Sequence, residues 1–145
     1  MTTKLVVGLD GLSSGDKALE YGKKMASLIG DCEMVLLYVI EWSPYSFQTP
    51  EENAERHKRR EQEIELAMSR IVLPAEAAAK EAGFKARGIV RHGDVAGTLD
   101  AVAVEENANQ IIIGRTSDGG FASWVVGGVP AKLVMNASVP VTVIN

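Results

Sequence analysis

Residues 111–130, IIIGRTSDGGFASWVVGGVP, have the composition of a phosphate-binding loop. Three isoleucines end at Gly114, and two Gly-Gly pairs follow among hydroxyl and aromatic residues. Glycines let a backbone approach a ligand closely, and the N–H groups at the start of a helix point toward phosphate oxygens. The stretch therefore predicts a strand, a phosphate-binding loop and a helix, in that order.

The charge of this loop is poor for binding an anion. Arg115 is its only cation, and Asp118 would repel phosphate. The side chains of Arg115, Thr116 and Ser117 offer donors for phosphate oxygens. The glycines are equally expected if they only make a tight connection between a strand and a helix. Both interpretations stay open from the residues alone.

Asp10 is the acidic residue best placed for chemistry, because it ends the first apolar run of the chain. A carboxylate there can contact a ligand, or it can cap the turn from Gly11 to Ser14. Asp10 is also the one candidate for a catalytic base. We therefore expect no enzyme, with slow ATP hydrolysis as the open alternative.

The histidine, cysteine and serine patterns indicate neither a metal centre nor a nucleophile. His57, His92 and Cys32 do not have the spacing of metal ligands, and the pattern G-x-S-x-G is absent. His57 lies in a charged segment where it is expected to be exposed. His92 follows a strand predicted at the edge of the sheet, away from the expected ligand site. Cys32 is expected to be a buried structural thiol.

The elements that position these residues alternate between apolar runs and amphipathic stretches. Strands are predicted at Lys4–Asp10, Glu33–Glu41, Lys85–Arg91, Gln110–Gly114 and Val139–Asn145. Helices are predicted from Ser13 to Ile29, from Glu51 to Gly83 with a perturbation near Pro74, from Asp94 to Asn107, and from about Gly127 to Asn136. This order predicts an α/β domain with a doubly wound, five-stranded parallel sheet and helices on both faces.

Side chains that cap the helices can be named in advance. Ser13 and Ser14 are predicted to cap the first helix, Gly30 to end it, and Asp94 to cap the third. Ligands of such a fold bind beyond the carboxyl ends of the strands, where the strand order reverses. Asp10 and Gly114 are expected at that edge.

Composition limits the remaining possibilities. The 145 residues fit a single domain, residues 1–145, with 46% hydrophobic and 23% charged residues. The net charge of −4 argues against a nucleic-acid surface, and no apolar run is long enough to predict a membrane span. No signal peptide is predicted. One cysteine fits a reducing compartment, so we expect a cytoplasmic protein.

Four segments together resemble the universal stress protein family over nearly the whole chain. They are VVGLDGLSSGDKALEYG, LLYVIE, GDVAGTLDAVAVEENANQIIIG and SVPVTVI. Their order and spacing carry the resemblance more than any one of them. The resemblance implies the strand order 3-2-1-4-5, homodimers and, in one subclass, a site for an adenine nucleotide.

The nucleotide motif of that subclass is matched only in part. It reads G-x-x-G, nine residues, then G followed by Ser or Thr. Gly114 matches its first glycine and Gly127 its third, whereas Ser117 replaces the second glycine and Gly128 the hydroxyl residue. A left-handed conformation at Ser117 would cost about 1–2 kcal/mol, and the lost hydroxyl bond roughly 1.5–3 kcal/mol. Weak nucleotide binding is therefore expected.

The resemblance also implies roles for individual residues. Asp10 would approach the ribose or a metal ion, and the backbone of Val39 would hold the adenine edge. The implied site comprises Asp10, Val39, Gly114, Arg115, Thr116, Ser117, Gly127, Gly128 and Val129. The implied ligand is ATP or another adenine nucleotide such as AMP, with or without Mg²⁺.

Two functions remain open from the sequence. One is a small regulatory stress-response protein that binds an adenine nucleotide. The other is a dimeric adaptor that binds no nucleotide and acts through an unknown protein partner. A homodimer through Val139–Ile144 is expected in either case, since an edge strand that is apolar on both faces would otherwise leave its backbone groups unpaired.

Overall fold

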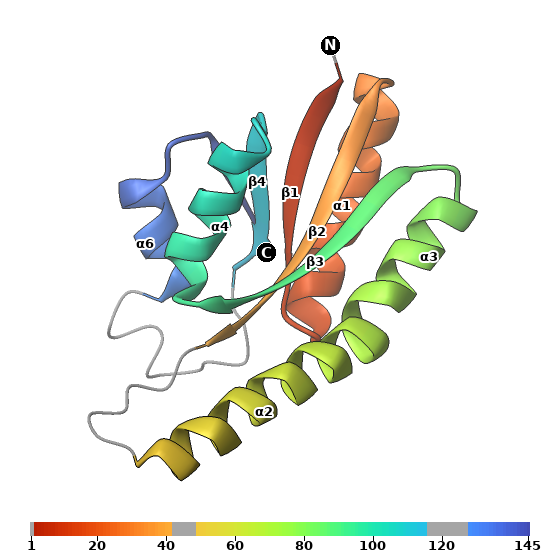
Figure 1. Cartoon of the computed structure of the whole chain (residues 1–145). Coiled ribbons are helices and arrows are strands. Elements are labelled where there is room, and N and C mark those ends of the chain that lie inside the picture. Colours follow the sequence, from red (N-terminus) through yellow and green to blue (C-terminus); the bar gives the residue numbers. More distant parts are fainter. Residues whose placement is uncertain (1, 42–48, 116–127) are drawn as a thin grey trace.

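The computed structural model describes residues 2–41, 49–115 and 128–145. Their strands form one sheet in the order β3-β2-β1-β4-β5, and every neighbouring pair is parallel (Figure 1). The strands are β1 (Thr3–Leu9), β2 (Cys32–Glu41), β3 (Lys85–Gly93), β4 (Gln110–Gly114) and β5 (Val141–Ile144). The predicted fold class and strand order are confirmed.

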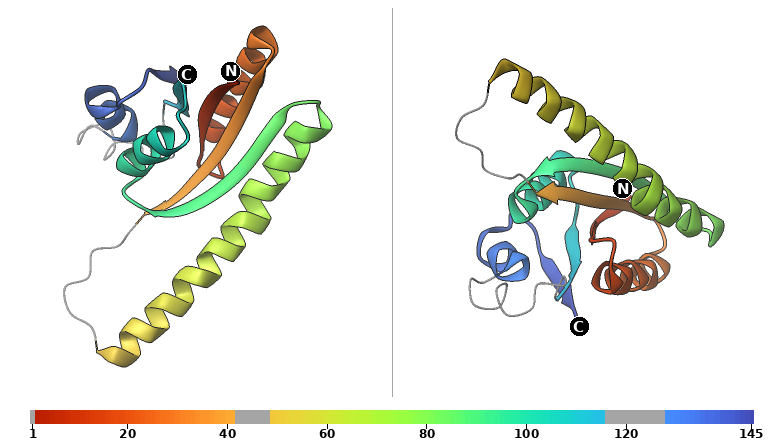
Figure 2. Two further views of the ribbon diagram at one scale, coloured as in Figure 1. Left: turned by 45° about the horizontal axis from the view of Figure 1, so that its top comes forward. Right: turned by 90° about the horizontal axis from the view of Figure 1, so that it is seen from below.

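Helices cover both faces of the sheet (Figure 2). One face carries α1 (Ser13–Ile29) and a long helix made of α2 (Pro50–Ala67), the π-helical turn η1 (Met68–Val72) and α3 (Leu73–Glu81). The other face carries α4 (Val95–Glu105) and α6 (Val129–Asn136). This division follows from right-handed crossovers. The chain first adds β2 and β3 on one side of β1, and it then crosses the opposite face to add β4 and β5 on the other side.

Strand residues alternate between the two cores, which explains their nearly continuous apolar runs. Leu5 and Val7 of β1 pack in the core beneath α1, while Val6 between them packs beneath α4 and α6. In β4, Ile112 belongs to the first core and its two isoleucine neighbours to the second. Because both faces of a parallel sheet are buried, the middle positions of a central strand are apolar on both sides.

The last strand begins later than predicted. Pairing in β5 starts at Val141 rather than Val139, because Pro140 has no N–H to donate, although its carbonyl accepts from the Ile111 N–H at 2.9 Å. Helix α6 begins at Val129, with Gly128 as its N-cap, and the predicted start at about Gly127 lies outside the described residues. The final segment is apolar on both faces, as predicted, since Val139, Val141 and Val143 pack in one core and Ile144 in the other.

The long helix is interrupted where Pro74 was expected to perturb it. Pro74 cannot donate to the carbonyl of Arg70, and the helix widens just before it, so that the Leu73 N–H bonds the Met68 carbonyl. Val72 then fills the space above Gly88 of β3, where no side chain would fit. Gly83, with φ +92°, ends α3 as predicted.

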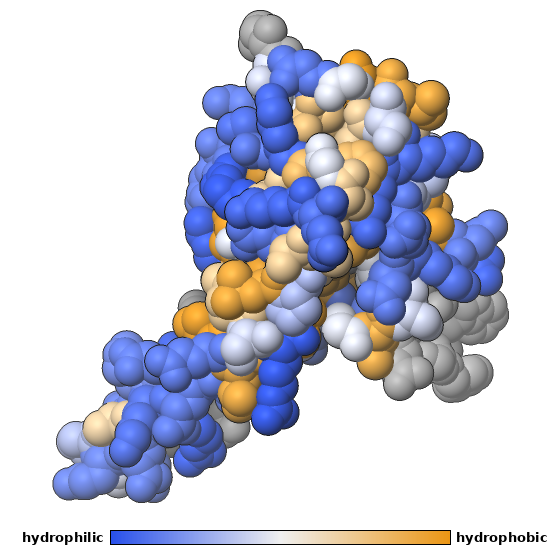
Figure 3. Space-filling model, turned by 90° about the vertical axis from the view of Figure 1, so that its right-hand side faces the viewer, coloured by the Kyte–Doolittle hydropathy of each residue, from blue (hydrophilic) through white to orange (hydrophobic). Residues whose placement is uncertain are grey.

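Helix α2 extends past the sheet as a mostly hydrophilic arm (Figure 3). It starts with a capping box in which Thr49 Oγ1 accepts from Glu52 N at 3.2 Å and Glu52 Oε2 accepts from Thr49 N at 3.1 Å. Ala67, its last residue, is its one buried residue. Within the described ranges, no helix combines the length and the apolar character needed to span a bilayer.

Candidate functional site

The carboxyl ends of β1 and β4 form the switch point of the sheet. Strand β1 pairs with β2 up to Leu9 and Tyr38, and with β4 up to Val7 and Ile112. The connection after β1 crosses one face, through α1, and the connection after β4 reaches α6 on the opposite face. The two connections leave this point toward opposite faces of the sheet. Ligands of doubly wound folds bind at such a point.

Four of the predicted site residues lie at this edge. Asp10 directly follows β1, Gly114 ends β4, and Arg115 comes next. Val39 lies one residue beyond the last β1–β2 pair and still pairs with Arg91 of β3. Thr116, Ser117 and Gly127 lie outside the described residues.

Asp10 organises the turn between β1 and α1. Its Oδ1 accepts from the N–H of Leu12 at 2.8 Å and from the N–H of Gly15 at 2.9 Å. The predicted caps Ser13 and Ser14 were wrong, because the N-cap is Leu12 and it makes no side-chain capping bond. A carboxylate arriving from the preceding strand satisfies the first turn of α1 instead.

Gly15 is needed for this arrangement, which sequence reasoning missed. A Cβ at residue 15 would lie 2.5 Å from Asp10 Oδ1 and 2.6 Å from Asp10 N. Neither atom could move away without breaking the turn. The one available signal was a glycine in the first turn of a predicted helix, where glycine is otherwise unfavourable.

Packing, as well as the nucleotide motif, favours a glycine at residue 114. A Cβ there would overlap Ser14 Oγ and would lie 2.5 Å from the Ser14 carbonyl oxygen. The end of β4 therefore rests directly on the first turn of α1. The backbone N–H of Arg115 donates to the Ile144 carbonyl at 2.6 Å and so continues the pairing of β4 with β5. The Arg115 residue is exposed.

Gly128 and Val129 lie at the start of α6. Gly128 is its N-cap, without a side chain to cap it, and its carbonyl accepts from Lys132 N at 3.2 Å. Val129 and Pro130 begin the helix. Gly128 thus supplies no side-chain cap to the first turn of α6, and the N–H groups at the start of a helix are those that can bind an anion.

The histidines and the cysteine lie away from this edge. His57 is exposed and pairs with Glu61, as expected for a charged helix. His92 Nε2 lies 3.3 Å from Glu63 Oε2 and links the edge strand β3 to α2. Burial, together with Asp31 and Glu33, raises the pKa of the buried Cys32 thiol, which disfavours a reactive thiolate. The described residues contain no cluster of three or more metal-binding side chains.

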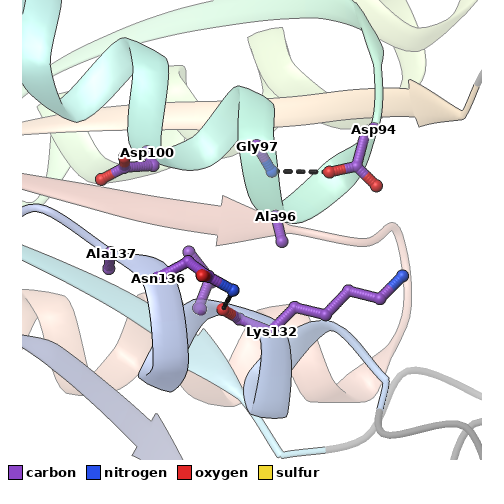
Figure 4. A pocket seen from close by; sticks show the side chains of 8 residues that line it. Asp94, Ala96, Gly97, Asp100, Lys132, Asn136 and Ala137 are labelled. Atoms are coloured by element: carbon purple, nitrogen blue, oxygen red, sulfur yellow. Dashed lines mark hydrogen bonds between the residues drawn. The ribbon is translucent and has the colours of Figure 1, made fainter.

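A groove between α4 and α6 was not predicted (Figure 4). It has a volume of about 190 Å³ and is lined by Asp94, Ala96, Gly97, Asp100, Lys132, Leu133, Asn136 and Ala137. Asp94 Oδ2 accepts from Gly97 N at 2.8 Å, which confirms Asp94 as the cap of α4. The sequence signal for the groove was weak, since its residues come from two helices that are distant in the chain.

These features define a doubly wound α/β protein whose switch point lies at the carboxyl ends of β1 and β4. The sequence profile of the universal stress protein family matches residues 1–145. The chain belongs to that family. No curated protein sequence matches it.

Solved structures share the fold at low sequence identity. Hypothetical protein MJ0577 has a TM-score of 0.80 and 20% identity, over 99% of this chain and 96% of its own. A universal stress protein in complex with cAMP has a TM-score of 0.69 and 18% identity, over 99% and 97%. A universal stress protein family protein from Arabidopsis thaliana with AMP bound has a TM-score of 0.62 and 18% identity, over 98% and 90%.

Proposed function

We propose that this protein is a small regulatory protein of the stress response, and that it binds an adenine nucleotide at the carboxyl ends of β1 and β4. The observation that carries the proposal is the Asp10 carboxylate, held by two N–H bonds at the switch point. The cAMP and AMP complexes of proteins with the same fold support it. We include a single cytoplasmic domain in the proposal, in keeping with the one buried thiol.

Asp10 would orient the nucleoside. Both hydrogen bonds from the described residues end on Oδ1, so Oδ2 is the oxygen that accepts from ribose hydroxyls. The backbone of Val39, just past the last β1–β2 pair, would bind the adenine edge. The first N–H groups of α6 at Gly128 and Val129 would face the phosphates.

A magnesium ion fits this edge only with the help of the nucleotide. Mg²⁺ bound with ATP takes most of its ligands from phosphates and water and needs one or two carboxylates. Asp10 Oδ2 is the carboxylate oxygen in reach of such an ion. When bound, the ion would neutralise phosphate charge that Arg115 alone does not balance.

We propose binding without turnover. Phosphoryl transfer needs metal ligands and a positioned nucleophile around the phosphates. At the described part of this edge, Asp10 is the acid that could serve, and one of its oxygens already holds the α1 turn. Robust ATP hydrolysis that Asp10→Asn abolishes would contradict this part of the proposal.

The test is direct. Protein purified without added nucleotide should be examined for bound adenine by its absorbance ratio and by mass spectrometry, then titrated with ATP, AMP and adenosine in a calorimeter. We expect ATP or AMP to bind with high-micromolar affinity or weaker. Titrations without heat for any of the three ligands, at millimolar concentration, would contradict nucleotide binding.

The second candidate is a dimeric adaptor of the same fold, and it shares with the first a homodimer that the two sheet edges favour. The β3 edge carries Lys85, Arg87 and Arg91, and such charges discourage pairing with another strand. Strand β5, at the opposite edge, reads VTVI and carries no charge. We propose that β5 pairs with its counterpart in a homodimer. Light scattering at tens of micromolar should give a dimer, and a monomer would contradict the proposal.

A further inference from the structure

Lys132 lies in the groove between α4 and α6, and its side chain has a definite direction. Figure 4 shows it extended along the groove, with its ammonium group at the end toward which the β1 and β2 arrows point. Side chains of a helix lean toward its N-terminus, and Lys132 is one turn from the N-cap Gly128. The ammonium group is thus carried toward the start of α6 and the carboxyl edge of the sheet.

Among the described residues, no carboxylate forms an ion pair with Lys132. Lys4, Lys23, Lys80 and Lys85 each lie within 4.0 Å of a carboxylate oxygen. Within residues 2–41, 49–115 and 128–145, no carboxylate forms such a pair with Lys132. Lys132 is also exposed, so its ammonium group is accessible from solvent.

The two acids of the groove are engaged elsewhere. Both oxygens of Asp100 bind Ser138, accepting from its N–H at 2.8 Å and its hydroxyl at 3.0 Å. Asp94 Oδ2 caps α4, and the positive end of that helix offsets part of its charge. Asp94 still lies at the same end of the groove as the Lys132 ammonium group (Figure 4), so it sets a limit on the attraction for an anion.

We infer that Lys132 is a specificity-determining residue that selects phosphorylated adenine ligands over adenosine. The inference rests on the proposed nucleotide site and adds a second cation to Arg115. Arg115 directly follows β4 and Lys132 lies in α6, so the two cations come from different elements of the fold. A phosphate at the N-terminus of α6 would meet Lys132 as a point charge on a flexible stem.

The experiment is a set of calorimetric titrations at low salt with ATP, AMP and adenosine. The variants are Lys132→Gln, Lys132→Arg and the control Lys24→Gln, which removes the same charge from an exposed position of α1. We expect Lys132→Gln to weaken AMP about three- to fivefold and ATP more, with adenosine unchanged. Lys132→Arg should keep the preference for phosphate, and Lys24→Gln should behave as wild type.

A substitution that removes a negative charge near Lys132 should have the opposite effect on AMP binding. Asp94→Asn keeps an oxygen for the Gly97 N–H while removing the negative charge, so it should strengthen AMP binding and leave adenosine unchanged. If wild type binds neither AMP nor adenosine, the proposed function fails, and this inference fails with it. If AMP binds, but Lys132→Gln weakens AMP and adenosine alike or no more than Lys24→Gln does, the inference alone is overturned.

Discussion

The side chain of Ser14 occupies the space that a side chain at residue 114 would need. A Cβ on Gly114 would overlap Ser14 Oγ and would lie 2.5 Å from the Ser14 carbonyl oxygen. The contact joins the first turn of α1 to the end of β4 at the switch point. A glycine of the nucleotide motif is thus required by packing, whether or not a nucleotide binds.

Gly114→Ala should destabilise the fold by about 1–3 kcal/mol, because the added methyl meets backbone atoms that cannot rotate away. Chemical unfolding would measure the loss. The double variant Ser14→Gly, Gly114→Ala is the control, and it should recover only part of the stability, since the Ser14 carbonyl remains. An unchanged unfolding midpoint for Gly114→Ala would show that the contact is not as close as described.

Asp10→Ala should cost about 1–2 kcal/mol of stability, because the N–H groups of Leu12 and Gly15 lose their acceptor. Asp10→Asn keeps an oxygen in that place and should cost less. Both variants should weaken nucleotide binding, since both remove the charged oxygen proposed to face the ribose. Equal stability of the two variants would argue against the capping role.

Gly128→Ser should strengthen ATP binding more than adenosine binding. It restores a hydroxyl at the N-cap of α6, where a charge-assisted bond to phosphate contributes roughly 1.5–3 kcal/mol. Calorimetric titration with both ligands measures the difference, with Ser138→Ala, away from the start of α6, as the control. A variant that binds ATP no better than wild type would favour the adaptor.

Val143→Pro should convert the proposed dimer into a monomer. The Pro140 carbonyl accepts from Ile111 of β4 and the Ile144 carbonyl from Arg115, directly after β4. In this parallel pair the backbone groups of Val141 and Val143 therefore point to the free edge. Proline at residue 143 removes an outward N–H and spares the β4 ladder. Light scattering reports the change, and Val143→Ile, which keeps the N–H, should remain dimeric. A dimeric Val143→Pro would place the interface elsewhere.

Stability should decrease in acid partly through Glu106. The hydrogen bond from Arg87 lowers the pKa of Glu106, with help from Lys4. A lowered folded-state pKa stabilises the protein above the unfolded value near 4.5, and this stability is lost as the pH falls through the folded-state pKa.

The size of this effect is limited because the Arg87 side chain is 44% exposed, so we expect less than about 1 kcal/mol. Urea unfolding at pH 7 and pH 4 should show a smaller difference for Glu106→Gln than for wild type. Glu105→Gln, whose partner Arg91 is equally exposed, is the control. Equal pH dependence of wild type and Glu106→Gln would contradict the role of this carboxylate.

Periodicity determined the sheet in advance. The apolar runs that end at Leu9 and Gly114 are short and continuous, and only a strand covered on both faces needs such a pattern. Helices of the right length between the runs then required parallel strands. The switch point, and with it the placement of Asp10 and Gly114, followed from the order of these elements.

Only the tertiary structure decided which groups meet at that edge. Ser13 and Ser14 had the usual chemistry of caps, yet Asp10 took that role because β1 delivers its carboxylate to the turn while Gly15 lets the helix approach. Likewise, nothing local relates Lys132 to Asp94, which lie 38 residues apart. They share a groove because α4 and α6 pack side by side, and packing between distant segments is what a local pattern does not encode.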